Sequence, residues 1–167
     1  KNFPLLEKVH FELGIPVLIE NDATSATWAE VQLGVARESE NVIMVCLGTG
    51  IGAGLYFNSE LVRGAYGFAG EVGHMTIVPD GLPCPCGRSG CWERYASGSS
   101  LGDIAENLRS DGKIGLLRGD EYEGERPFSS ERVAQLVLKN DKEAMKVLEH
   151  FSDWLAMGLV NLVNILD

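Results

Sequence analysis

Apolar residues that recur every three or four positions predict five helices along the chain. In the first stretch they stand at positions 5, 6, 9 and 13, and Gly14 follows as a helix end. In the last stretch Asn140 and Glu143 offer a capping-box-like start to a long apolar stripe. The predicted helices cover residues 4–13, 23–33 (closed by Gly34), 99–109, 130–138 and 142–166.

Short apolar runs bounded by turn residues predict the strands. Pro16–Glu20 has the pattern of a short buried strand, and residues 41–47 are rich in β-branched side chains. A hairpin is predicted from residues 53–57 and 61–63 around the turn at 58–60, and a further strand over Met75–Val78. Glycines make 64–73 irregular, and 110–127 is a loop or an insertion. The predicted class is mixed α/β.

Composition excludes two classes of partner. The net charge of −10 opposes nucleic-acid binding, which needs clustered Lys and Arg to replace counterions. Apolar runs such as Val42–Leu47 are far shorter than the roughly 20 residues of a membrane span, and the first residues lack the apolar core of a signal peptide. At 167 residues, the chain can form one sizeable core.

The four cysteines have different surroundings. Cys46 lies in an apolar run, where a small buried hydrophobic side chain is the simplest interpretation. Cys84, Cys86 and Cys91 fall within eight residues, ten positions after His74. A Cys₃His set is a tetrahedral zinc complement, closed by protein ligands and therefore structural. A disulfide or free thiols remain the alternatives, although Cys84 and Cys86 are poorly spaced for bridging each other. Reduced cysteines predict a cytoplasmic protein.

Three further groups of residues each have a functional and a structural interpretation. Asp22 follows Asn21 at a predicted strand end, where it is either a helix N-cap or a general base. Gly48, Thr49 and Gly50 form either a tight turn or a phosphate-binding turn.

The carboxylates that flank the zinc ligands in sequence, Glu71 and Glu93, are the third group. Glu71 and His74 either bracket the vicinal hydroxyls of a sugar, or are a solvated carboxylate beside a structural zinc ligand. Neither interpretation is decided by these residues alone.

Four runs taken in order resemble the ROK family (repressors, open reading frames and sugar kinases). They are ENDA at 20–23, GTGIGAG at 48–54, GFAGEVGH at 67–74 and CPCGRSGCWERYAS at 84–97. The resemblance implies an actin/hexokinase-like fold of two RNase H-like lobes with a ligand cleft between them. Residues 1–15 would end the small lobe, and 16–167 would form an incomplete large sugar-binding lobe with a zinc loop at 74–91.

The resemblance also assigns roles to residues. Asp22 matches the base that takes the proton of the sugar 6-hydroxyl as it attacks the γ-phosphate. The sugar-binding positions match Asn21, Glu71, His74 and Glu93. The second phosphate-binding turn matches Gly48, Thr49 and Gly50, and the zinc ligands match His74, Cys84, Cys86 and Cys91.

Within the family, the chain looks most like bacterial glucokinases. The implied activity is transfer of the γ-phosphate of ATP, bound with Mg²⁺, to a hexose, with glucose as the expected acceptor, in a homo-oligomer (dimer or tetramer). The alternative is the sugar-sensing domain of a ROK repressor, and a third hypothesis is a scaffold that keeps the zinc fold without catalysis. The first phosphate loop and the C-terminal adenosine-side glycines of the family are absent from the sequence. The chain is therefore expected to be a partial copy that is inactive alone.

Overall fold

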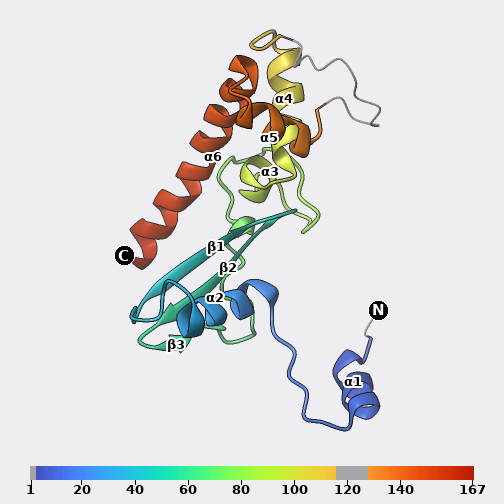
Figure 1. The fold of residues 1–167 in the computed structure, drawn as a ribbon, viewed down its shortest axis with the longest axis vertical. Coiled ribbons are helices and arrows are strands. Elements are labelled where there is room, and N and C mark those ends of the chain that lie inside the picture. The colour runs from blue at the N-terminus through green and yellow to red at the C-terminus, as the bar shows by residue number, and fades with distance from the viewer. Residues whose placement is uncertain (1–2, 116–127) are drawn as a thin grey trace. The chain divides into compact units, whose positions relative to one another are not determined.

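The computed structural model describes residues 3–115 and 128–167 (Figure 1). The chain packs as two compact units, Lys1–Met44 with Gly54–Ala69 and Val45–Ala53 with Gly70–Asp167. It passes from one unit to the other within strands β1 (Val42–Leu47) and β2 (Ile51–Phe57). Within the described ranges, none of the helices is both long and apolar enough to cross a membrane.

The first unit contains two of the predicted helices. Helix α1 (Leu5–Leu13) ends at Gly14, whose φ of 64° is the left-handed conformation that glycine adopts without steric cost. Helix α2 (Asp22–Leu33) ends at Gly34. A small apolar cluster holds this unit together; it consists of Val31, Ala36 and Tyr56, with Val42 and Leu61 packed alongside.

The strand predicted at Pro16–Glu20 is wrong. The segment has no regular secondary structure, and Leu18 is 83% exposed. A strand forms only when its backbone N–H and C=O groups pair with a neighbour, and none of the described strands pairs with this segment. The segment therefore has neither the burial nor the pairing partner that its apolar pattern predicts.

A three-stranded sheet follows in the order β1–β2–β3, where β3 is Glu60–Leu61. The predicted hairpin is confirmed: β2 and β3 pair antiparallel, with Tyr56 opposite Leu61. Its turn residues Asn58 and Ser59 have φ of 51° and 63°, the left-handed pair that matches the twist of a two-residue hairpin.

The second unit is built mainly from helices. Helices α4 (Ser100–Ser110), α5 (Ser130–Leu138) and α6 (Lys142–Leu166) agree with the predicted ranges and pack against one another (Figure 1). The cap of α6 is Asp141 rather than Asn140, since the Asp141 carboxylate accepts from the N–H groups of Glu143 and Ala144. The loop predicted at 110–127 lies mostly outside the described residues. The helical core is formed by Ile104, Ala105, Leu108, Ile114, Phe128, Val133, Ala144 and Val147.

Two short elements around the cysteines differ from the prediction. The strand predicted at Met75–Val78 is reduced to one bridge between Thr76 and Cys91. The amides of Ile77 and Val78 both donate to the carbonyl of Gly90, so a ladder cannot extend here. The sequence pattern also missed the 3₁₀ turn η1 (Val72–His74) and the single-turn helix α3 (Glu93–Ala96).

Candidate functional site

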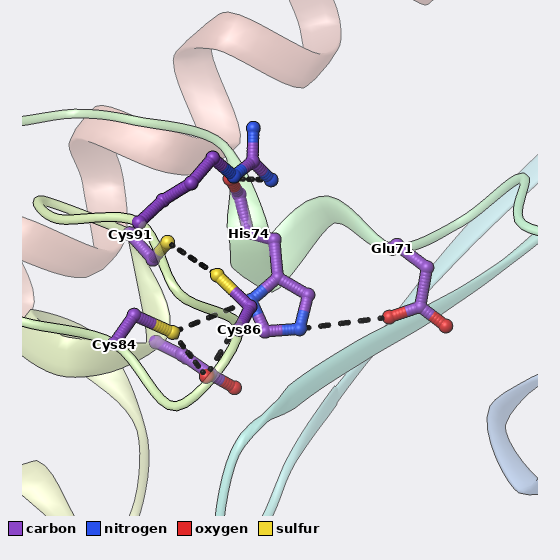
Figure 2. A network of polar contacts seen from close by, with 7 residues as sticks. Glu71, His74, Cys84, Cys86 and Cys91 are labelled. Atoms are coloured by element: carbon purple, nitrogen blue, oxygen red, sulfur yellow. Dashed lines mark hydrogen bonds and ion pairs between the residues drawn. The ribbon is translucent and has the colours of Figure 1, made fainter.

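The second unit brings His74, Cys84, Cys86 and Cys91 together (Figure 2). One ligand atom from each residue lies within 4.8 Å of the others. Cys84 Sγ is 3.6 Å from His74 Nδ1, and Cys86 Sγ is 3.6 Å from Cys91 Sγ. We call these four residues the Cys₃His cluster.

The local backbone explains how four residues from two segments meet. The amide of Cys84 donates to the carbonyl of Arg88 at 2.8 Å, which closes a tight turn that carries Cys84 and Cys86. The Thr76–Cys91 bridge then brings Cys91 back beside the segment that follows His74. Gly90 has φ 77°, and a Cβ there would overlap the carbonyl of Val78, so only glycine permits this approach.

The three thiols differ in acidity because their surroundings differ. Burial raises the pKa of Cys84 to about 12, and burial also raises the pKa of Cys91. A hydrogen bond from the Arg88 backbone lowers the pKa of Cys86 to about 6. Metal ligation requires the thiolate form, so binding of a metal here releases protons.

The geometry of the Cys₃His cluster fits a tetrahedral ion. With Zn–S near 2.3 Å and Zn–N near 2.0 Å, the ligand atoms of a tetrahedron lie about 3.5–3.8 Å apart. Two of the ligand pairs already lie 3.6 Å apart. The donor set therefore could hold a metal, and its softness and closed coordination suit zinc.

Two carboxylates lie beside the cluster. Glu93 Oε1 accepts from the Cys84 thiol at 3.2 Å and lies 3.5 Å from His74 Nδ1. Glu71 Oε2 lies 3.9 Å from His74 Nε2 (Figure 2). The two nitrogens of the His74 ring thus face different partners: Nδ1 faces the cysteines and Nε2 faces Glu71.

The glycine-rich turn belongs to the same unit. Residues Gly48–Gly50 join β1 to β2, and the N–H of Gly48 donates to the carbonyl of Gly50 at 3.0 Å. Beside the turn lies a cavity of about 960 Å³, at the upper end of the size range of small-molecule pockets. Its walls include Gly48, Thr49, Gly98, Ser99, Arg109 and Phe128.

Asn21 and Asp22 lie in the first unit, at the start of α2. Asn21 is the N-cap, because its side-chain oxygen accepts from the Thr24 amide at 3.0 Å. The interpretation of Asp22 as the N-cap is therefore wrong. The Asp22 side chain is exposed, and its Oδ1 accepts from the amide of Ala23 at 2.8 Å.

Sequence reasoning missed two contributors. Arg88 Nη2 donates to the carbonyl of His74 at 3.2 Å, and the guanidinium of Arg109 lies 5.4 Å from the centre of the Phe128 ring in the cavity wall. Arg88 lies within the Cys86–Cys91 segment, which is a weak signal for a role at the cluster. Nothing in the sequence pattern links Arg109 to the glycine-rich turn.

Comparison with known proteins gives a family and a set of relatives. The model of the ROK family matches residues 1–167. The glucokinase of Streptomyces coelicolor is 38% identical over 98% of this chain and 52% of its own length. The xylose repressor of Bacillus subtilis is 34% identical over 98% of this chain and 38% of its own length.

Solved structures of ROK family proteins also match the chain. A ROK family glucokinase from Streptomyces griseus in complex with glucose and AMPPNP matches with a TM-score of 0.82 and 35% identity. The match covers 97% of this chain and 53% of that one. The likeness confirms the predicted actin/hexokinase-like lobe, and the chain spans about half the length of these kinase relatives.

Proposed function

The chain belongs to the ROK family, and on this basis we propose that it is the sugar-binding part of a hexose kinase. The reaction is transfer of the γ-phosphate of ATP to the 6-hydroxyl of a hexose, with glucose as the expected acceptor. The domain assignment remains part of the proposal: residues 1–15 end the small lobe, and 16–167 belong to an incomplete large lobe. The chain alone is expected to be inactive, and the complete enzyme to be a homo-oligomer.

The observation that carries the proposal is the state of Asp22. Asn21 caps α2, so the Asp22 carboxylate is exposed and is not needed to cap the helix. Phosphoryl transfer requires a group that accepts the proton of the attacking hydroxyl, together with precise positioning of the substrates. Asp22 is the proposed base for the 6-hydroxyl, a group that a sugar sensor without catalysis would not need.

The polar groups beside the Cys₃His cluster are the proposed sugar ligands. Glu71 and Glu93 can accept hydrogen bonds from sugar hydroxyls, and His74 Nε2 faces away from the cysteines. Asn21 is proposed as a further ligand through its side-chain NH₂ group, since its oxygen is committed to the cap. Charge-assisted bonds of this kind fix the orientation of a sugar.

Two ions complete the proposed enzyme. The Cys₃His cluster would hold zinc, whose closed coordination fixes the loop that carries His74 and Glu93. Mg²⁺ would bind together with ATP and would neutralise the charge that develops on the phosphates. Neither ion is assigned a role as a nucleophile or base.

The cavity beside the glycine-rich turn supports a nucleotide as the phosphate donor. Among the described residues of its walls, Asp103, Glu106 and Glu131 lie beside one arginine, Arg109, and this acidic balance disfavours a long polyphosphate. Carboxylates can instead accept hydrogen bonds from ribose hydroxyls. A volume of about 960 Å³ leaves room for a nucleoside next to the turn.

A coupled assay of the complete protein with ATP, Mg²⁺ and a panel of hexoses tests the proposal. Asp22→Asn keeps the shape of the side chain but removes the base, and should lower kcat by about 10²–10⁴-fold with little change in sugar affinity. Asp153→Asn, an exposed acid on α6, is the matched control and should keep the parent rate.

The second candidate function is the sensor domain of a repressor, which the match to a xylose repressor favours. It predicts sugar binding without turnover in both the parent and Asp22→Asn. Phosphorylation that survives in Asp22→Asn at the parent rate would contradict the role of the base.

A further inference from the structure

The two carboxylate oxygens of Glu93 face two different parts of the second unit. Oε1 lies 3.2 Å from Cys84 Sγ and 3.5 Å from His74 Nδ1, within the Cys₃His cluster. Oε2 lies against the glycine-rich turn, where a Cβ added at Gly50 would be only 2.7 Å from it. Position 50 is therefore restricted to glycine as long as Glu93 keeps this orientation.

The backbone that follows Glu93 holds the other end of the turn. Glu93 begins α3, and Gly98 lies just after the Ser97 cap at the end of this helix. The N–H of Gly98 donates to the carbonyl of Gly48 at 2.8 Å. Residues 93–98 thus contact the first and the last glycine of the turn.

The same segment is anchored at the cluster. Cys91 and Trp92, directly before α3, are fully buried, and the Trp92 indole N–H donates to the carbonyl of Trp154 on α6. A shift of Cys91 would therefore shift the start of α3, and with it Glu93. Because these neighbours are packed, a displacement at one end is transmitted rather than absorbed.

We propose that Glu93 is a positioning residue that couples the metal cluster to the phosphate-binding turn, in addition to its sugar contact. The inference rests on the proposed function, since that assigns the metal to the cluster and the phosphates to the turn. Metal binding removes the proton that the Cys84 thiol donates to Glu93 Oε1, so occupancy of the cluster changes what holds the Glu93 carboxylate beside Gly50, and with it the path of the turn. Coupling between two binding sites is reciprocal, so a change in the turn must alter metal affinity.

The test is Gly50→Ala in the metal-loaded protein, with Zn²⁺ retention measured by competition with a chromophoric chelator. The new methyl group meets the far end of the Glu93 side chain, so the carboxylate must move. Changes in the outer shell of a metal site typically cost about 10–100-fold in affinity, and a carboxylate displaced beside the Cys84 thiolate should give about tenfold weaker Zn²⁺ retention. Gly48→Ala is the control for metal retention, because its Cβ would meet none of the described atoms within 4 Å.

A double-mutant cycle separates coupling from simple damage to the turn. In a Glu93→Ala background, Gly50→Ala should cause no further loss of Zn²⁺, because the side chain that it displaces is gone. A further loss in that background would overturn the proposal, as would Zn²⁺ retention equal in Gly50→Ala and the parent. A parent that binds no Zn²⁺ overturns it as well. None of these results decides the kinase proposal, which depends on turnover and Asp22.

Discussion

The two units differ in how completely they bury their apolar side chains. In the second unit Trp92, Val133 and Val147 are fully buried, and three helices enclose a common core. In the first unit α1 has no buried residue among its described positions, and Phe11, Leu18 and Val35 are 84%, 83% and 98% exposed. The second unit therefore has the larger common core, although Leu138 and Ile165 are 83% and 73% exposed there, whereas α1 in the first unit packs none of its side chains into a core.

This difference bears directly on the proposed site. The Cys₃His cluster and the glycine-rich turn lie in the well-packed unit, whereas Asp22 lies in the other. Local stability within a protein follows burial and contact, so opening should be easier in the first unit. We therefore expect the Cys₃His cluster and the glycine-rich turn to be preorganised. The position of Asp22, the proposed base, should be held less firmly by its own unit.

Metal removal should have the largest effect and should be confined to the second unit. A bound metal present at about 1,000 times its Kd stabilises the folded state by about 4 kcal/mol. Chelation should therefore speed amide hydrogen exchange across residues 72–92, measured by mass spectrometry, and leave 22–33 unchanged. Cys84→Ser should already exchange fast and show no response to the chelator. An equal loss of protection from amide exchange in both units would contradict the prediction that the effect of the metal is confined to the second unit.

Gly158→Ala should be the next most damaging change. Alanine normally stabilises a helix by about 1 kcal/mol relative to glycine. Here a Cβ would overlap the buried indole of Trp92, and overpacking a core typically costs about 1–3 kcal/mol. Chemical denaturation should therefore show destabilisation, opposite in sign to the helix propensity.

Gly54→Ala gives the matched substitution in the first unit. Its Cβ would overlap the side chain of Thr27, a buried residue of α2. Thr27 is fully buried, but the apolar cluster around α2 is small, so this helix can shift more easily than Trp92, and the free energy of unfolding should fall by less than in Gly158→Ala. An equal or larger loss at Gly54 would remove the distinction between the units.

Most of the regular elements could be predicted from the sequence, because each carries its own signal. The apolar stripe of α6 and the glycine that ends α1 are each local to one helix, and the structure confirms both helices. The proximity of His74 to the three cysteines also followed from their short spacing. These features need no knowledge of distant contacts.

The features that the sequence analysis missed or predicted wrongly depend on contacts or backbone geometry that no local pattern records. Pro16–Glu20 has the composition of a strand but needs a pairing partner, which no local pattern can supply. The choice of Asn21 over Asp22 as the cap depends on where the backbone becomes helical: Asn21 is extended, with ψ 143°, and Asp22 is the first residue of α2. The contact of Glu93 with Gly50 joins residues far apart in the chain, and only the folded backbone brings them together.

The smallest predicted effect compares one carboxyl group from each unit. The hydrogen bond from Arg63 lowers the pKa of Glu20, and the backbone N–H of Gly115 lowers that of Glu143, with Lys146 as a lesser cause. In both cases the pKa is below its ordinary value, so the stabilising contact is present above that value and is lost as pH falls through the lowered one. Both groups are exposed, which keeps the effect on stability small.

NMR titration of the side-chain carboxyls between about pH 2 and 7 should show that Arg63→Gln returns the pKa of Glu20 toward normal. Lys146→Gln should leave the pKa of Glu143 lowered, because the backbone donor remains. A return to normal in Lys146→Gln would mean that the Gly115 contact is not maintained in solution, and that the second unit is less rigid there than its core implies.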